Sequence, residues 1–323
     1  MPTSLWAQVR YLACLGAALG LCGGMEGVAM TQEPRVVGVP VASVYADIYD
    51  DSERVTQVVR GEVVLVEPHK RYRSLVKVAV PNQYRQPQGY PGWMEGDCLL
   101  PLGASPNQLL LPPAPTPSLR PWSLANDPQE PSQLLIIDPE VGLYPEPDLE
   151  SEPLDLLLAG SIITPAVPRP FSQDGPDFWA VHLPGFSDTY YIPAHSASTT
   201  TLPLAPLDLL DSAFKFEGSP YLWGGMSCHG IDCSGLVYQV FKLHGLIVPR
   251  DADQQFQVGE IVETDQLQPG DLVFFGSSPQ KVGHVGFYLG EDQFWDASGR
   301  QGVAASSLLD PKYRQTFLGG RRY

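Results

Sequence analysis

Charged residues are scarce in this chain of 323 residues: they make up 17% of it, against 43% hydrophobic residues. Disordered polymers and long coiled coils are more charged and less apolar, so both classes are excluded. Basic residues are scarcer still, and 20 of them against 36 acidic residues give a formal net charge of −16. Because phosphate backbones and anionic lipids repel such a chain, we expect no nucleic-acid partner.

Long apolar runs are lacking as well. The run Y-L-A-C-L-G-A-A-L-G-L-C follows Arg10, and it is too short to span a bilayer but matches the apolar core of a signal peptide. We therefore expect residues 1–29 to be removed on export to the periplasm or cell envelope, with Gly27 and Ala29 at the cleavage site. Cleavage before Cys22, as in a lipoprotein, is the less favoured alternative.

Cysteine is rare, with only five residues. Cys14 and Cys22 lie in the predicted signal peptide, which leaves Cys98, Cys228 and Cys233 in the mature chain. A disulfide scaffold needs a larger, even set, so at least one free thiol should exist outside the cytosol. We therefore expect this free thiol to have a functional role.

Proline and glycine are abundant, with 33 and 31 residues, and they favour short strands and turns. Residues 36–110 and 133–200 each read as a series of short alternating strands, separated by a Pro-rich linker at 111–132. The strand rhythm and the endings G-W and Y-I-P resemble bacterial SH3-like modules. We therefore expect two small all-β barrels in tandem.

The segment 205–323 has a different character. Residues 207–216 and 234–244 have the apolar spacing of amphipathic helices, and a glycine-rich turn lies between them. Four strand-like runs follow, beginning with D-L-V-F-F and H-V-G-F-Y-L-G. Helices first and an antiparallel sheet second predict an α+β domain.

Cys233 follows the glycine-rich turn and opens the second helix. Helix N-terminal amides favour the thiolate, and the amides of Cys233 and Ser234 can also hold an oxyanion. His284 begins one strand and Asp296 lies on the next, so an antiparallel hairpin can bring them together as base and orienting carboxylate. These residues predict a cysteine nucleophile with its catalytic partners.

The motifs P-Y-L-W-G-G, G-I-D-C-S-G-L-V, I-V-P-R-D-A, L-Q-P-G-D-L-V-F-F, G-H-V-G-F-Y-L-G and D-A-S-G resemble, in this order, the NlpC/p60 family of cell-wall cysteine peptidases. The resemblance implies a papain-like α+β fold and hydrolysis of the bond between γ-D-glutamate and a diamino acid such as meso-diaminopimelate in peptidoglycan peptides. By motif position Cys233 is the nucleophile and His284 the base. Asp296 stands where many members have a second histidine.

Some members carry two SH3-like modules and accept only peptides with a free N-terminal L-Ala, which implies such muropeptides as substrates here. In those enzymes an acidic residue before the nucleophile and groups of the first module hold the amine. By position these are Asp232, Tyr90 and, as a further candidate, Glu62. Tyr221 and Trp223 would line the cleft.

Other interpretations remain open. Asp232 can be a helix N-cap, and Tyr90 and Glu62 can be ordinary barrel residues. Cys228, His229 and Cys233 lack a second ligand pair, so we expect no metal and no cofactor. The rival functions are an N-acetylmuramoyl-L-alanine amidase on the same fold and a catalytically silent cell-wall binding protein.

Overall fold

A computed structural model describes residues 32–83, 85–86, 89–102, 117–124, 126–127, 129–172 and 176–323. The predicted signal peptide and the first residues of the predicted linker lie outside these ranges. Within them, no helix combines the length and apolar character that crossing a bilayer requires.

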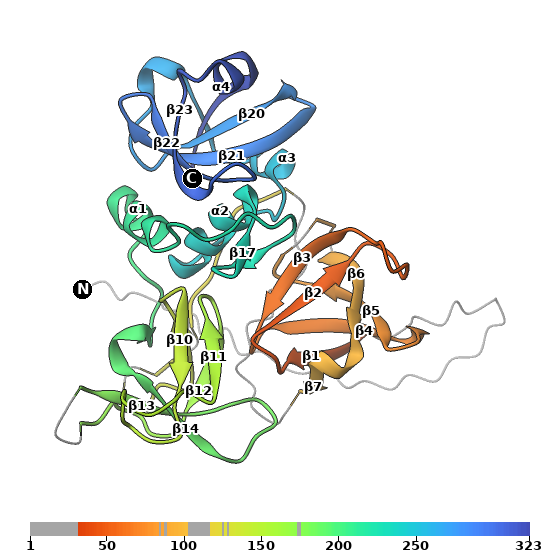
Figure 1. Cartoon of the computed structure of the whole chain (residues 1–323), viewed down its shortest axis with the longest axis vertical. Helices are drawn as coiled ribbons and strands as arrows, with labels where there is room; N and C mark the ends of the chain where they lie inside the picture. The colour runs from red at the N-terminus through yellow and green to blue at the C-terminus, as the bar shows by residue number, and fades with distance from the viewer. Residues whose placement is uncertain are drawn as a thin grey trace, which may run out of the picture. The chain divides into compact units, whose positions relative to one another are not determined.

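The first β-rich part is a seven-stranded antiparallel sheet (Figure 1) with the order β3-β2-β6-β5-β4-β1-β7. Small apolar residues at alternating positions, such as Val44, Val58 and Met94, fill its core. Its strands are β1 (Glu33–Val37), β2 (Val41–Tyr45), β3 (Arg54–Val59), β4 (Val63–Tyr72), β5 (Leu75–Val80), β6 (Tyr90–Glu95) and β7 (Leu99–Pro101).

The second β-rich part has a five-stranded sheet in the order β14-β13-β12-β9-β15 and a separate ladder of β10 with β11. Leu134, Ile136, Trp179 and Ile192 pack in its core. Its strands are β9 (Leu134–Ile136), β10 (Glu140–Leu143), β11 (Asp155–Leu158), β12 (Ile162–Pro165), β13 (Phe178–His182), β14 (Thr189–Pro193) and β15 (Ala197–Ser198).

The β-rich character of this half is as predicted, but closed barrels are not found among the described strand pairings. In the first sheet β3 and β7 stand at opposite ends of the pairing order, and in the second part β10 and β11 pair with each other outside the main sheet. Alternation along a strand predicts the strand and its buried face, whereas closure depends on pairing between distant strands, which alternation does not encode.

The C-terminal part places three of its four helices before an antiparallel sheet, as predicted, and the fourth helix between the last two strands along the chain. The sheet has six strands in the order β19-β24-β20-β21-β22-β23. Its strands are β19 (Glu260–Val262), β20 (Leu272–Ser278), β21 (Lys281–Gly290), β22 (Gln293–Ser298), β23 (Gly302–Ser307) and β24 (Phe317–Arg322). The helices are α1 (Pro206–Phe214), α2 (Cys233–Leu243), α3 (Ala252–Gln255) and α4 (Pro311–Thr316), and the short strands are β16 (Met226–Ser227), β17 (Gly230–Ile231) and β18 (Leu246–Ile247), the last paired with β8 (Arg120–Pro121).

Helix α2 is the centre of this part, and all of its residues are buried. It begins where the Asp232 side chain accepts a hydrogen bond from the Gly235 amide at 2.6 Å, and it ends before Gly245, whose φ of +80° favours glycine. Phe241 of α2 stacks on Phe287 of β21, with ring centroids 5.9 Å apart. This packing fixes the C-terminal end of α2 against the sheet.

Polar side chains of α2 join it to both β-rich parts. The Lys242 ammonium lies 2.7 Å from Glu62 Oε1 and donates to the Gly160 carbonyl at 2.8 Å. The Tyr238 hydroxyl donates to the Asn82 carbonyl at 3.1 Å. The Lys242 and Glu62 side chains are 1% and 5% exposed, so each charge depends on the other for compensation.

Candidate active site

Cys233 is the first residue of α2, and its side chain is 7% exposed and lines a cavity. The Gly235 amide is used by the Asp232 cap. The amides of Cys233 and Ser234 come earlier in the first turn, where a helix supplies no carbonyl partner. The N-terminus of α2 therefore places a thiol beside two amides that can stabilise a negative oxygen.

His284 on β21 and Asp296 on β22 form a hydrogen bond of 2.7 Å between Nε2 and Oδ2. The antiparallel pairing of the two strands brings them together, and Asp296 is fully buried. The Cys233 sulfur lies close enough to His284 for the two groups to interact. Because Nε2 faces Asp296, Nδ1 is the ring nitrogen left for the sulfur. The three residues thus form a continuous chain of contacts.

The charges around His284 stabilise its protonated form. Burial alone would lower the pKa of His284, but the Cys233 sulfur and the Asp296 carboxylate together raise it to about 10. The imidazole is therefore protonated at neutral pH when it faces the thiolate. An imidazolium of this kind can protonate a leaving amine.

Tyr313 on α4 completes this group, although no sequence motif had pointed to this residue. Its ring stacks on the His284 ring with centroids 5.7 Å apart, and its hydroxyl lies 3.3 Å from Asp296 Oδ2. Burial and the nearby Asp296 charge raise the pKa of Tyr313 to about 12, so the hydroxyl remains a donor. Tyr313 thus holds both the histidine and its carboxylate.

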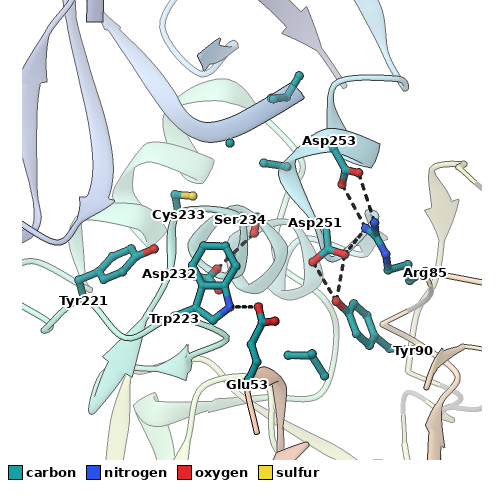
Figure 2. Close-up of a pocket in the computed structure, with 14 residues that line it drawn as sticks. Glu53, Arg85, Tyr90, Tyr221, Trp223, Asp232, Cys233, Ser234, Asp251 and Asp253 are labelled. Carbon is teal, nitrogen blue, oxygen red and sulfur yellow. Dashed lines mark hydrogen bonds and ion pairs between the residues drawn. The ribbon is translucent and has the colours of Figure 1, made fainter. Parts of the chain in front are cut away.

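The Cys233 cavity has a volume of about 310 Å³ and is lined by residues of the first sheet and of the C-terminal part (Figure 2). Five of the predicted residues besides Cys233 line it: Tyr90, Tyr221, Trp223, Asp232 and Ser234. Four charged residues that the sequence did not single out line it as well: Glu53, Arg85, Asp251 and Asp253. The first sheet therefore forms one wall of the cavity.

Asp251, which directly precedes α3 in the C-terminal part, lies against that wall. It accepts a hydrogen bond from the Tyr90 hydroxyl at 3.1 Å and pairs with the Arg85 guanidinium. Arg85 also lies 3.2 Å from Asp253. Burial raises the pKa of Asp251, although the guanidinium groups oppose this shift. Glu53 accepts a bond from the Trp223 indole at 2.6 Å and adds a further negative charge.

A second cavity of about 380 Å³ lies on the other side of the catalytic pair. His284, Lys312, Tyr313 and Ser298 are among the residues that line it. Tyr221 and Gly283 line both cavities. A peptide can therefore pass the cysteine and the histidine with one part in each cavity.

Comparison with known proteins identifies the family of this chain. The NlpC/P60 family profile matches residues 218–322. A γ-D-glutamyl-L-lysine dipeptidyl-peptidase of Bacillus cereus is 31% identical over 280 residues, which are 83% of this chain and 74% of the relative. The chain belongs to the NlpC/P60 family of cysteine peptidases. A Bacillus subtilis protein of the same name is 30% identical over 73% of this chain and 69% of its own length.

The family likeness extends through the β-rich half. The crystal structure of an NlpC/P60 protein from Bacillus cereus superposes with a TM-score of 0.72, covering 90% of this chain and 99% of the other. Its sequence identity is 24%, so this comparison concerns the fold. The superposition shows that both proteins have β-rich sheets followed by the NlpC/P60 domain.

Two predicted substrate-binding residues of this NlpC/P60 chain have structural partners. The Asp232 oxygens accept bonds from Gly224, Gly235, Ser234 and both terminal nitrogens of Arg250, which is buried. These donors use its acceptor positions, so the structure gives Asp232 the part of an N-cap and ion-pair partner. Glu62 is not among the residues that line the cavity, because its carboxylate is paired with Lys242. The structure thus places Glu62 in a buried ion pair and outside the lining of the Cys233 cavity, and the predicted substrate contact of Glu62 stays a prediction.

The protonation of His284 leads to a prediction about pH. Since its pKa of about 10 lies above the ordinary value, the imidazolium persists through neutral pH, and activity should fall as the pH rises through about 10. Asp296→Asn removes the carboxylate charge and should move this alkaline limb down by about one to three units. Profiles of kcat/KM against pH for the two proteins measure the shift.

The control for Asp296→Asn is Tyr313→Phe, which keeps the ring on His284 and removes only the longer hydrogen bond to the same oxygen. Its alkaline limb should move much less. If Asp296→Asn left the limb in place, the orienting role of Asp296 would have to be abandoned.

Proposed function

We propose that this NlpC/P60 peptidase is exported to the cell envelope and cleaves the γ-D-glutamyl–diamino acid bond of peptidoglycan peptides that have a free N-terminal L-Ala. The names of its Bacillus relatives specify a γ-D-glutamyl-L-lysine bond and the release of a dipeptide from the amino end. A dipeptidyl-peptidase must bind the substrate's amine at a fixed distance from the scissile bond. The first sheet supplies a wall at which this can happen.

The reaction follows from the contacts at Cys233. The thiolate attacks the γ-carbonyl carbon, and the amides of Cys233 and Ser234 stabilise the oxyanion. The His284 imidazolium gives its proton to the leaving amine, and the neutral imidazole then takes a proton from the water that hydrolyses the thioester. Asp296 keeps Nδ1 of His284 directed at the sulfur through its bond to Nε2.

The observation that best supports the amine requirement is the acidic wall of the Cys233 cavity. A peptide ammonium there would face Asp251, Glu53 and the Tyr90 hydroxyl. Arg85 offsets only part of this negative charge, because it is shared between Asp251 and Asp253. An acylated amine lacks the positive charge and is larger, so it should bind poorly.

The second cavity suits the leaving diamino acid. The Lys312 ammonium at its edge can pair with the carboxylate of that residue. This assigns the acyl part of the substrate to the Cys233 cavity and the leaving part to the His284 cavity. We further propose that residues 36–110 and 133–200 are divergent SH3-like modules, and that the first of them restricts the substrate to peptides with a free end.

The experiment compares three substrates: L-Ala-γ-D-Glu-meso-diaminopimelate, the same tripeptide with an acetylated amine, and its L-lysine analogue. Mass spectrometry should show release of L-Ala-γ-D-Glu from the free tripeptide and much slower cleavage of the acetylated one. Equal cleavage of both would disprove the amine requirement. Release of intact peptide from muramoyl peptides would instead show an amidase, and absence of any cleavage by reduced protein would favour a binding protein.

A further inference from the structure

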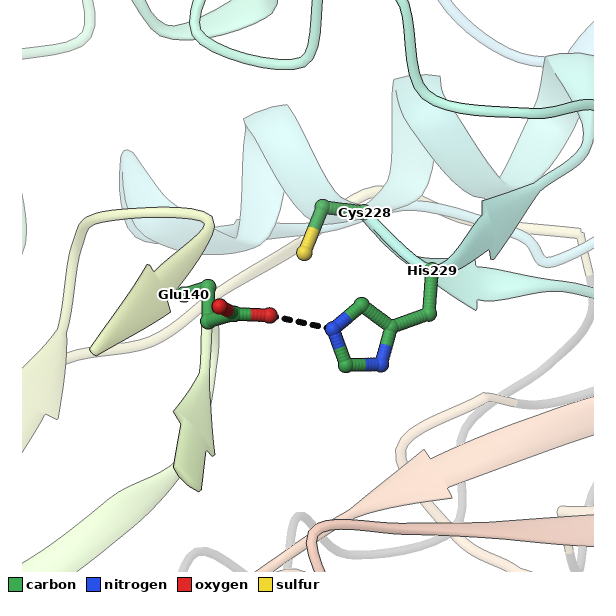
Figure 3. A group of neighbouring side chains, drawn as sticks. All are labelled: Glu140, Cys228 and His229. Atoms are coloured by element: carbon green, nitrogen blue, oxygen red, sulfur yellow. Dashed lines mark hydrogen bonds and ion pairs between the residues drawn. The ribbon is translucent and has the colours of Figure 1, made fainter. Parts of the chain in front are cut away.

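A second cluster of chemically active side chains lies outside the two cavities. Cys228 and His229 form the two-residue turn between β16 and β17, and Glu140 begins β10 in the second β-rich part. The Cys228 sulfur, the His229 ring and the Glu140 carboxylate face one another (Figure 3), with ligand atoms all within 4.8 Å of one another. The sequence offered only the C-H-x-x-x-C pattern, and the third group comes from a distant strand.

We propose that Cys228, His229 and Glu140 bind a zinc ion. Thiolate, imidazole and carboxylate are the three side-chain types that Zn²⁺ prefers, and water can complete a tetrahedral set. The thiolate and the carboxylate together also neutralise the charge of the ion. His229 and Glu140 are already in contact through Nε2 and Oε2, so little rearrangement is needed.

When the zinc ion binds, the Cys228 thiol must lose its proton. The Cys228 thiol lies 3.3 Å from the Pro139 carbonyl, and burial together with the Glu140 charge raises its pKa to about 11. The S–H bond therefore breaks as the S–Zn bond forms, and the proton passes to solvent. No oxidation or reduction takes place.

The position of the site indicates a structural role. The turn that carries Cys228 and His229 leads through β17 directly to Asp232 and the nucleophile helix. A zinc ion at Glu140 would tie this turn to the second β-rich part. It would stabilise the approach to the active site without touching the substrate.

The experiment uses the full chain with Cys233→Ala, because the Cys233–His284 pair could itself bind a metal. Cobalt titration should give one equivalent per chain, with a thiolate-to-cobalt charge-transfer band, and Zn²⁺ should displace the cobalt. Adding Cys228→Ser, His229→Ala or Glu140→Gln should weaken Zn²⁺ binding by at least about tenfold, a loss that even outer-shell changes can cause. Zn²⁺ should raise the melting temperature only when all three side chains are present.

Cys98→Ser in the same background is the matched control, since Cys98 is another partly buried free thiol. It should leave cobalt and zinc binding unchanged. The proposal fails if the parent takes up no metal, if Cys228→Ser binds as tightly as the parent, or if Cys98→Ser weakens binding equally. Melting temperatures without metal show whether each variant is folded.

Discussion

Cys233→Ala should lower kcat/KM for the free tripeptide by at least about 10⁴-fold, because removing one member of a nucleophile–base unit disables the whole unit. The structure supports this size of effect, since His284 interacts with the sulfur and no other described cysteine lines the Cys233 cavity. Release of L-Ala-γ-D-Glu, followed by mass spectrometry, measures the loss.

Cys98→Ala is the control for this substitution. Cys98 lies in the first β-rich part, away from both cavities, and its loss should leave kcat/KM close to wild type. The Cys233→Ala protein should also keep its melting temperature, because only one sulfur atom is removed. Residual activity within tenfold of wild type in a folded Cys233→Ala protein would mean that another group attacks the peptide.

Asp251→Asn should lower kcat/KM for the free tripeptide by about 10²-fold or more, the effect of removing one partner of a desolvated charge pair. The amide has nearly the same shape as the carboxylate and can still accept a bond from Tyr90, so the change is mainly one of charge. Most of the loss should appear as a higher KM, since the proposal gives Asp251 the binding of the amine and no part in the chemical step. Initial rates over a range of peptide concentrations separate the two constants.

Asp253→Asn is the comparison for Asp251→Asn. Asp253 shares Arg85 with Asp251, but the hydrogen bonds of Tyr90 go to Asp251. We expect Asp253→Asn to lower kcat/KM less than Asp251→Asn does. We also expect the ratio of kcat/KM for free peptide to kcat/KM for acetylated peptide to be smaller in Asp251→Asn than in wild type. An equal loss on both peptides would assign Asp251 a purely structural role.

The α+β layout and the start of α2 could be predicted because their signals are local. Apolar spacing gave the helices, the glycine-rich turn gave the position of Cys233, and the hairpin brought His284 beside Asp296. Asp251 and Glu53 could not be predicted in the same way. Glu53 meets the cavity only because the first sheet packs beside the C-terminal part, and the same packing brings Tyr90 and Arg85 to Asp251. No local pattern encodes that packing.

Asp232 and Glu62, the two acidic residues that were predicted to contact the substrate, have buried ion-pair partners that the sequence did not predict. A carboxylate just before a helix can hold a ligand or cap the helix, and only its neighbours decide. For Asp232 that neighbour is the buried Arg250, and for Glu62 it is Lys242. Arg250 lies outside the local motif of Asp232, and Lys242 lies in another part of the chain from Glu62. Neither pairing could therefore be predicted from the local sequence.

Arg250 and Lys242 also restrict how such a gene can recombine. Arg250 donates to Thr56 of the first sheet at 2.9 Å, and Lys242 depends on Glu62. A fragment encoding residues 218–323 alone would keep the ion pair of Arg250 with Asp232, but Arg250 would lose Thr56 and Lys242 would lose Glu62. Breaking a buried ion pair such as Lys242–Glu62 costs about 3–5 kcal/mol. Domain shuffling that replaces the β-rich half must therefore bring matching acceptors, so the two halves are expected to be inherited together.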